Sequence, residues 1–190
     1  MPIQVDVTQR RADVADATFR VAARDGLAAV TLRSVAAEMG VSTTTITNYL
    51  PTRADLLINA VDRMTDEWLA ELDAARTGRR PEEALRAVMR EAVSWDQDEL
   101  VRSQFWVAVL ATQSPQIRRQ VGEVEDAVRE VLVKLVDECG HPEAEAAADQ
   151  LFLFAQGSFA SIVEAPRRWT PARLRAAANA AVDGVLTGVG

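Results

Sequence analysis

A chain of 190 residues is long enough to bury a hydrophobic core, and its single cysteine excludes an intrachain disulfide framework. Its composition, 48% hydrophobic with frequent Ala and Val, favours helices over sheets. The formal net charge of −7 comes entirely from residues 56–190, because six arginines and six acidic side chains cancel within residues 1–55. Arginines grouped on one surface of that neutral segment can hold DNA phosphates.

No segment of the sequence has the pattern of a secretory leader or a membrane span. The first residues hold no apolar run, and the longest apolar stretch, 151–163, is interrupted by Gln156 and Ser158. A bilayer-spanning helix needs about 20 apolar residues, more than this stretch provides. Together with the free thiol, these features predict a cytoplasmic protein without a membrane partner.

Residues 8–25 predict a first helix, with Val14, Thr18 and Val21 on one face and a stop at Gly26. This helix is amphipathic, because its apolar side chains recur at the spacing of helical turns. A short connection then leads to residue 31, where a different pattern begins.

Residues 31–50 have the pattern of a helix-turn-helix. Val35 marks the apolar face of a first short helix, which ends near residue 39. Gly40 follows where the tight turn needs a positive φ, a conformation that glycine adopts at little cost. Ser42 is a natural N-cap for the second helix, on which Ile46 faces inward.

The second helix of this unit has a polar, uncharged outward face. Threonine is a poor helix former, so four threonines in five residues are unusual on a plain surface helix, which is the alternative. Side chains of this kind read base edges in the DNA major groove, where asparagine pairs with adenine and threonine methyls pack on thymine. Tyr49 has two open interpretations, a place in the core or a hydroxyl directed at phosphate. The outward side chains are Thr43, Thr44, Thr45, Thr47 and Asn48.

Helix signals continue almost without interruption to the end of the chain, and they predict an all-α fold with about nine helices. A long helix over 53–76 is followed by a loop at 77–81, where Pro81 begins the next helix. The continuous apolar run 105–111 predicts a helix that is buried on most sides. Further helices are expected from Pro115, Pro142 and Pro171.

The string GLAAVTLRSVAAEMGVS, followed by ITNYLPTRADLL, resembles the TetR family (tetracycline-repressor-like) of bacterial transcriptional regulators. The resemblance covers about residues 10–57. It implies a helix-turn-helix DNA-binding domain at 1–52 and a helical effector-binding and dimerisation domain at 53–190. It also implies a homodimer on a double-stranded DNA operator, most often a repressor that a small-molecule effector releases.

The resemblance also assigns phosphate contacts. Thr31 and Arg33 match the helix start that touches phosphate, and Arg53 matches the lysine that usually begins the fourth helix. The backbone N–H groups at these helix starts favour an anion as well. The expected DNA-binding residues are therefore Thr31, Arg33, Ser42, Thr43, Thr44, Thr45, Thr47, Asn48, Tyr49 and Arg53.

Three positions depart from the family's usual residues. Thr44 stands where the family often has glycine, Thr47 where it has an aromatic residue, and Leu50 where it has phenylalanine. The change at Thr47 removes a phenol that commonly contacts phosphate, so we expect weaker backbone contact or an unusual operator. It also leaves an alternative open, a ligand-binding helical dimer whose helix-turn-helix domain (residues 1–52, the head) is degenerate and does not bind DNA.

Aromatic, sulfur and amide side chains beyond the head provide the candidates for an effector pocket. An apolar wall suits an apolar or aromatic effector, while the acidic excess favours a cationic one. Ordinary core packing is the alternative interpretation of each residue. The expected effector-binding residues are Met64, Trp68, Met89, Gln104, Phe105, Trp106, Gln113 and Phe152.

Small residues on the last two helices allow another helix to approach closely. Gly157 and Ser158 have Ala155 and Ala160 as neighbours, and five alanines lie within 176–181. Tight packing inside one chain would use them equally well. The family resemblance favours a homodimer interface through these two helices.

Residues that carry catalytic or metal chemistry are sparse. His141 is the only histidine, and Cys139 has no second thiol to join it, so no metal or cofactor site is expected. The sequence shows no histidine placed to serve a nucleophile, no phosphate-binding loop and no distinct carboxylate pair. We therefore do not expect an enzyme.

Overall fold

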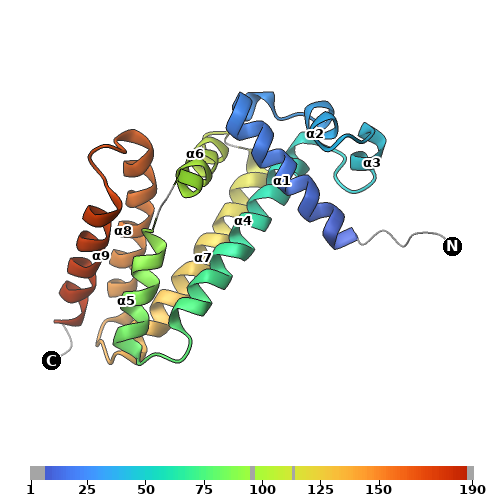
Figure 1. The fold of residues 1–190 in the computed structure, drawn as a ribbon. Coiled ribbons are helices and arrows are strands. Elements are labelled where there is room, and N and C mark those ends of the chain that lie inside the picture. The colour runs from blue at the N-terminus through green and yellow to red at the C-terminus, as the bar shows by residue number, and fades with distance from the viewer. Residues whose placement is uncertain (1–6, 95–96, 113, 188–190) are drawn as a thin grey trace. The chain divides into compact units, whose positions relative to one another are not determined.

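The computed structural model describes residues 7–94, 97–112 and 114–187, and within them the chain forms nine α-helices and one short 3-10 helix, with no strand. The all-α fold predicted from the sequence is confirmed. None of the described helices combines the length and the hydropathy needed to cross a membrane. The elements are α1 (Val7–Asp25), η1 (Leu27–Ala29), α2 (Leu32–Met39), α3 (Thr43–Thr47), α4 (Arg53–Arg76), α5 (Pro81–Ala92), α6 (Gln97–Leu110), α7 (Pro115–Glu138), α8 (Ala144–Glu164) and α9 (Pro171–Leu186) (Figure 1).

Local side-chain chemistry sets several helix ends where the sequence predicted them. Ser42 and Thr170 cap α3 and α9, because each side chain accepts a hydrogen bond from the backbone N–H three residues further on. Gly40 follows α2 in the left-handed conformation, with a φ of 67°. The predicted start of α8 is two residues early, because the chain still turns at Pro142 and becomes helical at Ala144.

Contacts within the chain divide it into two compact units, and the first contains the helix-turn-helix. This unit comprises Met1–Asp66 and Phe105–Val121. Helix α1 supplies one wall of its core and the start of α4 supplies another. The rings of Phe19 and Phe105 pack with their centroids 4.5 Å apart. The largest side chains that are fully buried in this core include Val14, Val21, Val35, Ile46, Leu56 and Leu57.

The start of α4 belongs to the core of the first unit. Leu56, Leu57 and Ala60 are buried among the helices of the head. The packing unit therefore runs past residue 52, where the sequence predicts the boundary between two functional domains. That functional division stays a prediction, since a shared core does not say which residues bind DNA or an effector.

The second unit comprises Glu67–Gln104 and Gly122–Gly190. Helix α9 packs against both α5 and α8 in it. Leu85, Met89 and Leu151 are almost completely buried in its main core. Ion pairs join its helices at the surface, with Arg129 on α7 2.6 Å from Asp149 on α8. These contacts make the second unit a helical bundle with an apolar interior.

Helix α6 is less buried than its apolar run predicted. Phe105 and Val109 are buried, but Trp106 is only half-buried and Leu110 is 37% exposed. The prediction of a helix buried on most sides is wrong for this segment. Within the apolar run the buried side chains, Phe105 and Val109, lie four residues apart and form a single stripe, so an apolar composition does not by itself place packing partners on every side.

Candidate nucleic-acid interface

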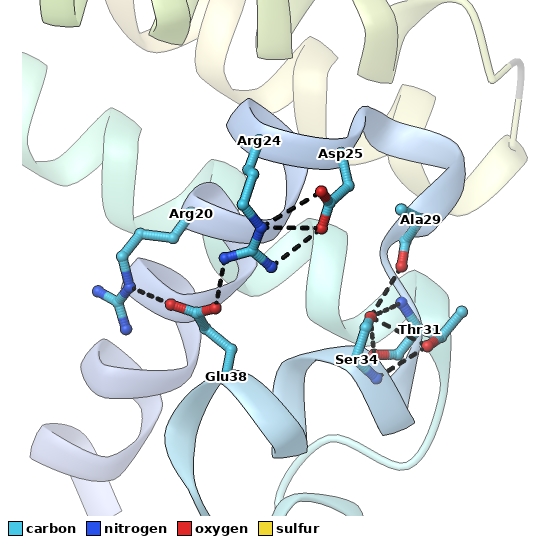
Figure 2. A network of polar contacts seen from close by, with 7 residues as sticks. All are labelled: Arg20, Arg24, Asp25, Ala29, Thr31, Ser34 and Glu38. Carbon is cyan, nitrogen blue, oxygen red and sulfur yellow. Dashed lines mark hydrogen bonds and ion pairs between the residues drawn. The ribbon is translucent and has the colours of Figure 1, made fainter.

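The helix-turn-helix begins with a reciprocal cap at the start of α2. The Ser34 N–H donates to the Thr31 hydroxyl at 3.0 Å, and the Thr31 N–H donates to the Ser34 hydroxyl at 2.9 Å. The Ser34 hydroxyl also donates to the Ala29 carbonyl at 2.7 Å (Figure 2). Side chains thus satisfy donors that the first turn of a helix leaves open, and they fix where α2 begins.

The turn between α2 and α3 is closed by backbone hydrogen bonds. The Val41 N–H donates to the Ala36 carbonyl at 3.0 Å, which follows from the left-handed conformation of Gly40. The Val41 side chain is half-buried and packs against the core of the first unit. The turn therefore has the structure that the sequence predicted, and it sets the direction in which α3 leaves.

Helix α3 is held by one buried side chain and presents a polar outer edge. Ile46 is 1% exposed in the core, whereas Thr43, Thr44 and Asn48 are exposed. Regular helix ends at Thr47, with Asn48 as the C-cap. The three exposed side chains are separated by one and four residues, which places them on one side of a helix. This is the edge that the sequence predicts to read DNA.

Two of the predicted contact threonines are partly engaged within the helix. The Thr47 hydroxyl donates to the Thr44 carbonyl at 3.3 Å, and the hydroxyls of Ser42 and Thr45 lie 2.9 Å apart. Both Thr45 and Thr47 are half-buried. Tyr49 is also half-buried and packs against the core of the head. Its aromatic ring thus contributes to packing, while a phosphate contact through its hydroxyl stays a prediction.

The two arginines predicted to contact phosphate have different surroundings. Arg33 is exposed near the start of α2. Arg53, the first residue of α4, donates from Nε to the Val30 carbonyl at 2.8 Å and from Nη2 to the Leu27 carbonyl at 2.9 Å. This contact could not be predicted from the sequence, because its acceptors are backbone carbonyls 23 and 26 residues earlier.

Ion pairs on the surface join α1 to α2. Glu38 on α2 accepts hydrogen bonds from Arg24 at 2.8 Å and from Arg20 at 2.9 Å, and Arg24 also pairs with Asp25 (Figure 2). The Arg24 guanidinium, followed by that of Arg20, holds the pKa of the Glu38 carboxyl below its ordinary value. Glu38 therefore stays ionised at neutral pH and ties α2 to α1.

The residues predicted to bind an effector are distributed over both units. Met89 and Phe105 are buried in the cores of the second and first units respectively. Gln113 lies outside the described residues. The first unit also contains Met64 and Trp106, and the second contains Trp68, Gln104 and Phe152. Their role in effector binding stays a prediction.

Helix α8 has three faces of different character. Leu151, Ala155, Ser158 and Ile162 are buried along one face. One residue further on, Phe152, Gln156 and Phe159 are half-buried, and the next positions, Leu153, Gly157 and Ala160, are exposed. Each face repeats at steps of four and three residues, the spacing of a helical stripe.

The half-buried face of α8 meets side chains from two other helices of the second unit. The Trp68 ring of α4 packs edge-on against Phe159, with centroids 6.0 Å apart. Gln156 donates to Glu125 of α7 at 2.9 Å. Burial, with a smaller contribution from Asp126, raises the pKa of the Glu125 carboxyl. Sequence analysis missed Glu125, Gln156 and Phe159, although the spacing of 152, 156 and 159 was visible.

The described part of the chain contains no group of three His, Cys, Asp or Glu side chains that could hold a metal ion. His141 accepts a hydrogen bond at Nδ1 from the Glu143 N–H at 3.1 Å. Cys139 is half-buried, and burial raises the pKa of its thiol. A raised pKa lowers the thiolate fraction, which makes this thiol a poor nucleophile at neutral pH.

Comparison with known proteins places the head in a known family. Residues 14–60 match the model of bacterial regulatory proteins of the tetR family. The HTH-type transcriptional regulator PksA of Bacillus subtilis is 28% identical over 112 residues, 58% of this chain and 55% of that protein. The match thus spans only about half the length of this curated relative.

Solved structures resemble the whole chain. A transcriptional regulator from Rhodococcus sp. Rha1 superimposes with a TM-score of 0.85 and 26% identity, covering 94% of this chain and 96% of that one. A regulator from Saccharomonospora viridis, solved in complex with choline, has a TM-score of 0.81 at 19% identity and covers 93% of this chain and 96% of its own. At 19% identity, the similarity to the Saccharomonospora viridis regulator concerns the fold alone.

The head and the helical bundle that follows it define this chain as an all-α protein with an N-terminal helix-turn-helix. The family match over the head and the likeness over nearly all of the chain make the assignment more specific. The head matches the tetR family of bacterial regulatory proteins over residues 14–60, which confirms the resemblance seen in the sequence.

Replacing the acid that joins α1 and α2 should destabilise the head in a pH-dependent way. Glu38→Gln keeps the size of the side chain but removes two ion pairs. Because the folded pKa of Glu38 is depressed, its contribution is complete above the ordinary value of 4.5 and is lost as pH falls through the lower folded value. Thermal unfolding followed by circular dichroism should show a lower melting temperature at pH 7 and a shrinking difference below pH 4.5.

Glu83→Gln is the matched control, since it removes a single exposed pair with Arg80 three residues away. We expect it to lower the melting temperature less than Glu38→Gln does at pH 7. Equal melting temperatures for Glu38→Gln and wild-type protein at pH 7 would contradict the role of Glu38.

Proposed function

We propose that the protein is a cytoplasmic, non-enzymatic DNA-binding regulator, which occupies its operator as a homodimer and leaves it when a small-molecule effector binds. The observation that carries this proposal is the outer edge of α3, where Thr43, Thr44 and Asn48 are exposed while Ile46 is buried. The match of residues 14–60 to the tetR family supports it. Repression, rather than activation, follows from the family's usual mode of action.

The chemistry of the α3 edge suits base recognition in a major groove. A side-chain amide such as that of Asn48 can pair with both N6 and N7 of adenine, and threonine offers a hydroxyl and a methyl group to bases. The edge carries no charge that would bind phosphates without regard to sequence. Arg33 and the N-terminus of α2 supply a backbone contact beside it, so orientation and base reading are divided between neighbouring helices.

The homodimer is proposed to form through the exposed faces of α8 and α9. Leu153 is 68% exposed, which is unusual for a large apolar side chain, and Gly157 and Ala160 follow it on the same face. A Cβ atom built on Gly157 meets nothing within 4 Å, so packing inside this chain does not require glycine there. Exposed alanines at 172, 176 and 180 give α9 a similar surface.

The effector is proposed to bind along the half-buried face of α8. Trp68, Phe152 and Phe159 supply an apolar lining, and Glu125 supplies one carboxylate. Aromatic faces beside a carboxylate suit an organic cation with an apolar body. The choline complex of a protein with the same fold supports this class of ligand. Binding shifts the DNA-binding equilibrium only as far as the effector prefers one state of the protein, typically 1–3 kcal/mol.

A second candidate function is a ligand-binding dimer whose head does not bind DNA. The observation in its favour is Thr47, a half-buried residue whose hydroxyl already donates to the Thr44 carbonyl and which replaces the aromatic residue usual in the family. The two functions differ in one measurable property, sequence-selective DNA binding.

Selection of bound duplexes from a random pool should yield a pseudo-palindromic operator for the wild-type protein. The triple variant Thr43→Ala, Thr44→Ala, Asn48→Ala should then lose selectivity, because each lost base contact costs about 1–3 kcal/mol of discrimination. Its non-specific binding at low salt should persist, because the phosphate contacts remain. Gln116→Ala, at an exposed position on α7, is the control and should leave selectivity unchanged. Undiminished selectivity of the triple variant would refute the proposed role of α3.

Gly157→Arg should convert the dimer to a monomer, because a charged side chain would be buried in the proposed interface without a partner. Sedimentation velocity measures the change directly. Gly122→Arg is a matched control on α7, since a Cβ atom there also meets nothing within 4 Å. A dimer that withstands Gly157→Arg would place the interface elsewhere.

A panel of organic cations that includes choline should contain a compound that releases the operator in a fluorescence anisotropy assay. We expect Phe159→Ala and Phe152→Ala each to raise the concentration needed for release about tenfold, equivalent to about 1.4 kcal/mol of lost binding. Phe154→Ala, on a different face of α8, controls for the loss of an aromatic ring. Unchanged release by both variants would exclude this face as the effector site.

A further inference from the structure

Arg53 joins two segments of the head through one guanidinium. Its Nε donates to the Val30 carbonyl and its Nη2 to the Leu27 carbonyl, at 2.8 and 2.9 Å. Both carbonyls lie in the connection that leads into α2, whereas Arg53 itself begins α4. The two donors on one edge of the planar guanidinium therefore fix the start of α4 to the start of α2.

The connection that Arg53 holds is the one that positions the proposed phosphate contacts of α2. Val30 is fully buried, and Thr31, the next residue, caps α2 through its bonds to Ser34. Arg33 follows within the first turn of the helix. A shift of Val30 would move Thr31 and Arg33 together, because no flexible residue separates them.

A lysine could not make the same contact. The guanidinium presents donors in a rigid plane, so Nε and Nη2 reach two carbonyls at once, whereas an ammonium group is a single point of charge on a flexible stem. No partner among the described residues occupies Nη1 of Arg53, and the side chain is exposed. That nitrogen remains available to an anion while the other edge is held.

We propose that Arg53 is a positioning residue, which orders the start of α2 so that Thr31 and Arg33 meet DNA phosphates in register with α3. This inference rests on the proposed function, and it differs from a plain phosphate contact at Arg53. A plain contact needs only a positive charge at that place. A positioning role needs the planar donor pair, and its loss acts on the contacts of another residue, Arg33.

Arg53→Lys separates the two roles, because it keeps the charge and removes the geometry. Operator affinity is measured as a function of salt concentration for wild-type protein, Arg53→Lys, Arg33→Gln and the double variant. We expect Arg53→Lys to lose about tenfold in affinity and to lower the salt dependence by about one phosphate contact, a slope change of about 0.9. The same slope change is expected for Arg33→Gln.

The double variant gives a second, independent result. If Arg53 acts through the start of α2, Arg33→Gln costs less affinity in the Arg53→Lys background than in the wild-type background. Additive losses would overturn the inference. Arg53→Lys with wild-type affinity and slope would also overturn it, because charge alone would then suffice. Arg33→Lys is the matched control, with an expected loss of less than threefold.

Hydrogen exchange in the free protein tests the tether without DNA. The amides of Val30 and Thr31, bonded to the Leu27 carbonyl and the Ser34 hydroxyl, should exchange faster in Arg53→Lys and in Arg53→Gln. The amides of α1 serve as an internal reference for correct folding. Unchanged exchange at Val30 and Thr31 in both variants would overturn the inference. A wild-type protein that selects no DNA at low salt would overturn the proposed function first, before any substitution is made.

Discussion

Ile46 anchors the polar outer edge of α3, because α3 has only five residues and a helix of that length is not stable alone. Burying such a side chain contributes about 1.5–3 kcal/mol, and it fixes the rotation of α3 about its own axis. The exposure of Thr43, Thr44 and Asn48 follows from that rotation. The polar edge is therefore a consequence of apolar packing on the opposite side of the same short helix.

Polar contacts around this core hold the neighbouring helices in place. Glu38 links α2 to α1 through two arginines, and Arg53 links the start of α4 to the connection before α2. Both contacts lie at the surface, where screening keeps their individual energies small. Their importance is geometric, since a DNA surface contacts several helices at once and tolerates little relative movement. The hydrophobic core supplies stability, while these contacts limit how the helices can shift.

Helix α8 shows how one element can serve three purposes. Successive positions turn by about 100°, so residues 151, 152 and 153 begin three different stripes. The first stripe is buried, the second is half-buried beside Trp68 and Glu125, and the third is exposed and rich in small residues. An effector on the second stripe and a partner subunit on the third would contact the same rigid helix, which gives a direct physical connection between the two proposed events.

The sequence alone determined the all-α fold, the positions of Gly40 and Ser42, and the direction of Ile46, because these depend on local backbone preferences and periodicity. Only the tertiary structure showed that Arg53 binds two carbonyls, that Glu125 meets Gln156, and that Trp106 and Leu110 of α6 are not fully buried. Each of these depends on segments that are distant along the chain. A residue's own type and its neighbours in sequence set what it can donate or bury, but the partner that it meets is decided by how whole helices pack.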